Sequence, residues 1–267
     1  MVDYAPGIRI DWSRFQVELD GVVVLRDGPL ELFACSPGTR EHESIVAVQA
    51  RPLHVFQALG LVGLQPGHPV TYDRQQDRWL PAAGDRLVID VRYRAGSALR
   101  TVSAWDWILD AATGKRPSPR EWLFCGSRRF PGGVFGADAD GTVVCVVDFD
   151  TTLIGLAESH SADNALLWAA ADPAAVPPAG TPCTLLLRPA VAPPLVVECA
   201  AQGRYRVDGA WVDGAGLREA ARQRREAHPG VRATIRLLPE APPQAAGTAA
   251  DLLRQAGVSC DQRPPAP

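Results

Sequence analysis

The sequence predicts an α+β protein with two domains: a β-rich antiparallel N-terminal domain and a small C-terminal α/β domain of ββαβα order. Gly and Pro are abundant, with 24 of each in 267 residues, which favours short strands and turns over long helices. Strand-like segments dominate the chain as far as residue 188. Two amphipathic helical segments follow in the last third, between shorter strand segments.

The domain boundary is expected at residues 189–194, Pro-Ala-Val-Ala-Pro-Pro, because a proline-rich segment forms a stiff linker. This divides the chain into a first domain of residues 1–188 and a second of residues 195–260. The remaining residues, 261–267, are rich in proline and are expected to be a disordered tail.

Residues 8–34 predict two or three strands. Within them, Asp20-Gly21 is a hairpin signal between two apolar segments. A further strand is expected at residues 45–48, after the turn that Pro37-Gly38 indicates.

A helix is expected to begin at Pro52, since proline suits the first helical turn. One apolar face follows at helical spacing, made by Val55, Ala58, Leu59 and Val62. Residues 86–93 instead alternate apolar and polar side chains at every position. This pattern is typical of a half-buried antiparallel strand.

The C-terminal pattern begins with two strands that end at the turn Asp208-Gly209. A helix at 217–228 and a strand at 231–238 come next, and a second helix covers residues 248–256. Thr248 is the expected N-cap of that last helix, with Asp251 three residues later.

The net charge of −3 predicts no nucleic-acid partner. Residues 188–267 are mildly basic, with 11 Arg against 8 acidic residues. No apolar segment is long enough to span a bilayer, so no membrane span is expected in this chain. The location is expected to be periplasmic or otherwise extracytoplasmic if a leader was removed, and cytoplasmic if none was.

Six cysteines are spread over the chain without any Cys-x-x-Cys pair, which excludes zinc-finger and iron–sulfur spacings. The densest group of reactive residue types flanks the Pro37-Gly38 turn. The candidate ligand-binding residues there are Glu31, Cys35, His42, Glu43, Ser44 and His54.

Three interpretations of this group are open. Cys35, His42 and His54 are ligand types for a divalent transition metal such as zinc. Alternatively, Cys35 is a nucleophile with His42 as its base, which requires a lowered thiol pKa. In the third interpretation, His42 and Glu43 form buried hydrogen bonds that fix the turn, and Cys35 belongs to the core.

Several segments resemble the YdjY domain family over about residues 8–188. The resemblance is carried by Glu31-Leu-Phe-Ala-Cys35, His42-Glu43-Ser44, Pro52-Leu-His54, Trp122-Leu-Phe-Cys-Gly-Ser127 and Gly180-Thr181. It implies a β-rich domain and carries no settled activity.

Residues 195–260 are similar to the extracytoplasmic domain of the ExbD and TolR proteins, which are partners of proton-driven motors in bacterial envelopes. The marks are the strand that ends at Asp208-Gly209, the helix start at Leu217, and the closing Leu-Leu-Arg-Gln-Ala-Gly-Val. Since those proteins work through a transmembrane helix that this sequence lacks, the resemblance implies fold and envelope location, without the motor role.

Taken together, these patterns favour a non-enzymatic binding or scaffold protein of the bacterial envelope, with a metal or small-ligand pocket near Cys35, His42 and His54. The partner is expected to be an envelope protein or a cell-wall component. A metal- or thiol-dependent enzyme at the same place is the alternative. A purely structural interaction module is the third function that the sequence allows.

Overall fold

The computed structural model describes residues 1–191, 193–228 and 230–261. The chain divides into two compact units, Met1–Ala190 and Val191–Pro267. Each unit has its own hydrophobic core. Of the predicted tail 261–267, only Asp261 is described; the rest lies outside the described residues.

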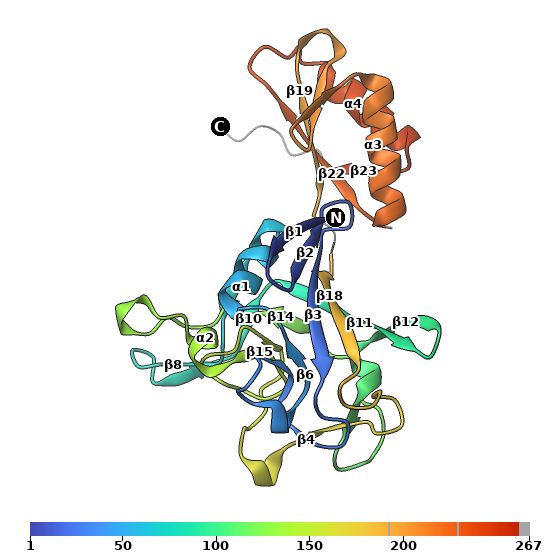
Figure 1. Ribbon diagram of the computed structural model, residues 1–267. Coiled ribbons are helices and arrows are strands. Elements are labelled where there is room, and N and C mark those ends of the chain that lie inside the picture. Colours follow the sequence, from blue (N-terminus) through green and yellow to red (C-terminus); the bar gives the residue numbers. More distant parts are fainter. Residues whose placement is uncertain (192, 229, 262–267) are drawn as a thin grey trace. The chain divides into compact units, whose positions relative to one another are not determined.

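A closed eight-stranded barrel forms the first unit (Figure 1). Its strands, in the order in which they pair, are β3 (Gln16–Val23), β18 (Pro182–Pro189), β11 (Arg86–Ala95), β14 (Trp122–Phe124), β16 (Ile154–Leu156), β15 (Thr142–Cys145), β5 (Leu32–Cys35) and β6 (Ser44–Val48). The pairing of β3 with β6 closes the ring. Val17 and Leu19 of β3 point into a core that also holds Trp107 and Trp122.

Two pairs of neighbouring barrel strands are parallel, β5 with β6 and β15 with β16. Each pair is joined by a short connection, residues 36–43 and residues 146–153, whereas parallel strands usually need a dozen or more residues. The connections lie against each other, since the Arg40 guanidinium stands 4.6 Å from the centre of the Phe149 ring.

Shorter elements surround the barrel. Strands β1 (Val2–Ala5) and β2 (Ile8–Asp11) extend the sheet from β3, and β12 (Ala98–Ser103) pairs with β11 to form a hairpin that projects from the barrel (Figure 1). Three small sheets pair β7 (Pro66–His68) with β10 (Ala83–Gly84), β8 (Thr71–Asp73) with β9 (Arg78–Leu80), and β17 (Ala169–Ala171) with both β4 (Gly28–Leu30) and β13 (Ile108–Asp110). The helices are α1 (Pro52–Leu61) and α2 (Gly136–Asp140), with short 3-10 turns η1 (Glu41–Glu43), η2 (Ala104–Trp107), η3 (Pro131–Gly133) and η4 (Asn164–Leu166).

The second unit is a five-stranded sheet with two helices. Its elements, in chain order, are β19 (Leu195–Cys199), the turn η5 (Ala201–Gly203), β20 (Tyr205–Val207), β21 (Ala210–Val212), α3 (Gly214–Ala227), β22 (Arg232–Leu237), α4 (Ala245–Gln255) and β23 (Ser259–Asp261). The strands pair in the order β21-β20-β19-β22-β23. None of the helices in the described part of the chain is long and apolar enough to cross a membrane.

The predicted fold class is wrong in both parts. The first unit is a closed barrel with two parallel pairs, and the described residues are only 21% helical. The second unit has strands β21 and β23 that the predicted ββαβα order lacks. Asp20-Gly21 is not a hairpin either, because β3 runs straight through it. Local turn propensity was overridden there by pairing with β6, which lies far away in the sequence.

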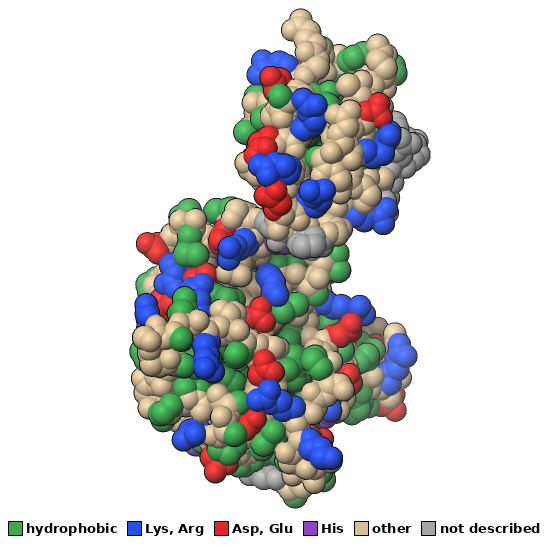
Figure 2. Space-filling model, turned by 90° about the vertical axis from the view of Figure 1, so that its right-hand side faces the viewer, with side chains coloured by type: hydrophobic (Ala, Val, Ile, Leu, Met, Phe, Trp, Pro, Cys, Tyr) green, Lys and Arg blue, Asp and Glu red, His purple; other side chains and the backbone are tan. Residues whose placement is uncertain are grey.

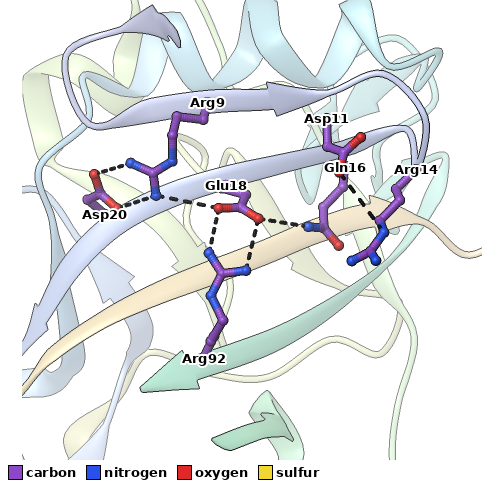
Figure 3. Close-up of polar contacts among 7 residues, drawn as sticks. All are labelled: Arg9, Asp11, Arg14, Gln16, Glu18, Asp20 and Arg92. Carbon is purple, nitrogen blue, oxygen red and sulfur yellow. Dashed lines mark hydrogen bonds and ion pairs between the residues drawn. The ribbon is translucent and has the colours of Figure 1, made fainter. Parts of the chain in front are cut away.

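A buried ion cluster ties three strands together on the outer face of the barrel (Figure 3). Glu18 of β3 is 1% exposed and accepts two hydrogen bonds from Arg92 of β11, at 3.0 and 2.6 Å. Arg9 of β2 binds Asp20 through two bonds of 2.6 Å and lies 3.4 Å from Glu18. Gln16 donates a further bond to Glu18 at 3.1 Å. Since β18 lies between β3 and β11, Arg92 bridges over a whole strand.

We expect Arg92→Ala to lower the free energy of unfolding by about 2–4 kcal/mol, because it leaves a buried carboxylate without its two strongest bonds. Urea unfolding followed through the core tryptophans measures this change. Arg94→Ala is the matched control, since Arg94 is an exposed arginine of the same strand and should cost at most about 0.5 kcal/mol. Equal stability of the two variants would contradict the prediction.

Candidate functional site

Five of the six predicted site residues lie on or directly beside β5, η1 and the start of β6, whereas His54 is on α1. Glu31 directly precedes β5, and its backbone N–H donates to the Glu43 carbonyl at 3.2 Å. Arg40 reaches Glu31 at 2.8 Å and comes within 4.0 Å of Glu43 and 3.9 Å of Asp140. One guanidinium therefore faces three carboxyl groups and an aromatic ring, that of Phe149.

Glu31 is the most perturbed acid of this group. Glu31 is only 6% exposed. Burial, together with the facing Glu43 carboxylate, raises the pKa of Glu31 to about 7, and the positive charge of Arg40 partly opposes this shift. A protonated Glu31 carboxyl can donate a hydrogen bond to the Glu43 carboxylate, which contributes to the raised pKa of Glu31. Arg40 covers this pair from outside. These contacts favour a role in holding the 36–43 connection in place.

Cys35 and Ser44 lie deeper. Cys35 is fully buried in a small cluster with Leu32, Ala47 and Cys145. Burial raises the pKa of the Cys35 thiol, whereas a nucleophilic cysteine needs a lowered one. The Ser44 side chain is also fully buried, and its hydroxyl has no hydrogen-bond partner within the described residues. The geometry thus supports the core interpretation of Cys35 over the nucleophile interpretation.

The three predicted metal ligands are not brought together. His42 is 73% exposed in its side chain and lies 3.4 Å from Glu43. His54 is in the first turn of α1, after β6, so the whole of that strand lies between the two histidines. Among residues 1–191, 193–228 and 230–261, no three His, Cys, Asp or Glu side chains form a group that could hold a metal ion.

A different feature, a concave surface, lies beside the barrel. A groove of about 420 Å³ runs between α1 and Tyr4 of β1. Its lining is mostly apolar and includes Phe56, Leu61, Leu64, Pro66 and Phe124. Polar groups come from Gln57 and Gln65, and the Tyr4 hydroxyl donates to Gln57 at 3.2 Å.

A second depression, of about 410 Å³, adjoins this groove at Tyr4. It is polar and includes Asp3, Arg9 and Asp20 in its lining. Tyr4 therefore lines both the apolar groove and the polar depression. This composition is typical of sites that take a ligand with one apolar part.

The groove could have been detected from the helix pattern. Helix α1 buries the predicted stripe that includes Val55, Ala58 and Leu59. Phe56 and Leu61 lie off that stripe, and Leu61 is 49% exposed. Apolar residues on a second side of a helix indicate a second contact surface. Tyr4 gave no such signal, since only the folded chain brings it to α1.

The shifted Glu31 pKa predicts a pH dependence of stability. The folded state holds this proton more tightly than the unfolded chain, so the stabilisation is complete below about pH 4.5 and is lost as the pH rises through about 7. We expect the unfolding free energy of the wild type to fall by about 1–3 kcal/mol relative to Glu31→Gln between pH 5 and 8. Urea titrations at four pH values measure the difference.

Glu158→Gln is the control for this experiment, because Glu158 is an exposed acid of the same unit. Its stability curve should run parallel to that of the wild type. If the stability curve of Glu31→Gln also ran parallel to that of the wild type, Glu31 would not have a raised pKa in the folded state.

Comparison with known proteins places the barrel unit in a family. The YdjY domain matches residues 8–188, about two thirds of the chain, from the start of β2 into β18. No curated protein and no solved structure matches the chain. The comparisons give no support to the predicted similarity of residues 195–260 to ExbD and TolR. The chain belongs to the YdjY domain family.

Proposed function

We propose that this chain is a non-catalytic binding protein, and that the groove beside α1 holds an extended peptide segment of a partner protein. The observation that carries the proposal is the position of Tyr4. This residue belongs to an edge strand and also forms a wall of an apolar groove. A single peptide could therefore pair with the strand and place a side chain in the groove.

The edge position supplies the main-chain part of this recognition. Strand β1 ends the sheet order, and within the described residues β2 is its only partner strand. The residues Val2, Asp3 and Tyr4 are exposed. An extended peptide that adds to such an edge gains main-chain hydrogen bonds, while neighbouring pockets select its side chains.

The groove supplies the side-chain part. Phe56, Leu61 and Pro66 offer apolar contacts, and the amides of Gln57 and Gln65 can bond a peptide backbone. A peptide with apolar side chains at alternate positions fits this combination. Such a partner agrees with the expected class, a binding or scaffold protein.

Three earlier expectations stay predictions. These are an envelope protein or cell-wall component as partner, an extracytoplasmic location, and a bound ligand at Glu31, Cys35, His42, Glu43, Ser44 and His54. The groove does not depend on any of them, because it is lined by a different set of residues.

We expect peptides selected from a random displayed library on the purified full-length chain to bind in the groove. Leu61→Asp should weaken them at least tenfold, since it places a carboxylate among apolar side chains. Leu99→Asp is the matched control, because Leu99 is 62% exposed on β12 of the same unit and lines neither depression. Titration calorimetry measures both affinities.

Two outcomes would contradict the proposal. The first is a set of selected peptides that bind Leu61→Asp as tightly as the wild type. The second is a library that yields no binder on folded protein. Circular dichroism of both variants confirms that the comparison is made between folded chains.

A further inference from the structure

The second unit has one sheet face that its helices leave open. The apolar sides of α3 and α4 pack on one face, where Leu217 and Leu253 meet Val197 and Ala233. The opposite face carries residues that alternate with these along each strand. Within the described part of the unit, neither helix joins this opposite face.

A straight row of four side chains crosses the open face. Trp211 of β21 pairs with Arg206 of β20, Arg206 pairs with Glu198 of β19, and Glu198 pairs with Arg236 of β22. Directly paired residues point to the same side of a sheet, so all four share one face. With strands about 4.8 Å apart, the row is about 14 Å long.

The row has a defined chemistry. The Trp211 ring is 46% exposed, and the guanidinium carbons of Arg204 and Arg206 lie 5.2 and 5.7 Å from its centre. Arg206 also forms an ion pair with Glu198. Arg236, at the other end of the row, is exposed. Within this row and the adjoining Arg204, three arginines outnumber the one carboxylate of Glu198, so this group of side chains is basic.

We propose that this open face binds an acidic polysaccharide. A sugar ring can pack on the part of Trp211 that Arg204 and Arg206 leave exposed, and arginines bond carboxylate groups through paired N–H donors. Glu198 in the middle of the row accepts hydrogen bonds, which sugar hydroxyls can donate. A polymer of uronic acids carries all three of these features in every residue: a sugar ring, hydroxyl groups and a carboxylate.

Single-stranded nucleic acid fits the face less well. Such ligands stack successive bases on several aromatic side chains, whereas Trp211 is the one exposed aromatic residue in the described part of this unit. Charges of both signs mix over the side of the molecule drawn in Figure 2, in agreement with a net charge of −3 and no broad basic field.

Titration calorimetry of the full-length chain with an octamer of α-1,4-linked galacturonate tests the proposal. We expect binding that Trp211→Ala and Arg236→Gln each weaken at least tenfold. Arg222→Gln is the matched control and should change the affinity less than twofold, because Arg222 is on the solvent side of α3, where it pairs with Glu219 and Glu226. Neutral maltooctaose should not bind.

Three results would overturn the proposal. One is the absence of binding to the galacturonate octamer. Another is unchanged affinity in Trp211→Ala, which would reduce the interaction to charge alone. The third is tighter binding of an eight-residue oligothymidylate, which would assign the face to nucleic acid. Since Leu61 belongs to the other unit, Leu61→Asp should leave the galacturonate affinity unchanged, so this test is independent of the groove.

Discussion

The closure of the barrel between β3 and β6 is the constraint on which the first unit depends. β3 and β6 come within bonding distance only because Gly21 has no side chain: a Cβ there would stand 2.8 Å from a methyl group of Val46 and 3.0 Å from the Ala47 carbonyl oxygen. One strand thereby pairs with β2, β18 and β6 along its length. Without this closure, the end of β3 and the free side of β6 would be exposed sheet edges.

Closure of the barrel also buries side chains next to the 36–43 connection. Cys35 of β5 and Ser44 of β6 are fully buried, and burial together with the facing Glu43 carboxylate raises the pKa of Glu31 beside Arg40. The contacts of Cys35, Glu31 and Glu43 favour a structural role for these three groups. The two surfaces proposed for recognition, the groove at Tyr4 and the open sheet face at Trp211, involve none of these groups.

Local patterns could predict local elements. The alternation of residues 86–93 correctly indicates a half-buried antiparallel strand, and Pro52 with its apolar stripe correctly indicates α1. Partners distant in sequence could not be predicted, because periodicity says which face is buried and not what covers it. Asp20-Gly21 therefore suggested a turn. The row across β21, β20, β19 and β22 depends on strand register, which the sequence of Trp211 alone does not contain.

Native-state hydrogen exchange at the closing seam tests this account most directly. The Val24 amide donates to Ile45 and the Gln49 amide donates to Asp20, each at 2.8 Å, across the junction of β3 with β6. The closed barrel predicts that both amides exchange as slowly as that of Val91, at the centre of the β11–β18 pairing. Exchange orders of magnitude faster at the seam, with Val91 still protected, would mean that the barrel is open.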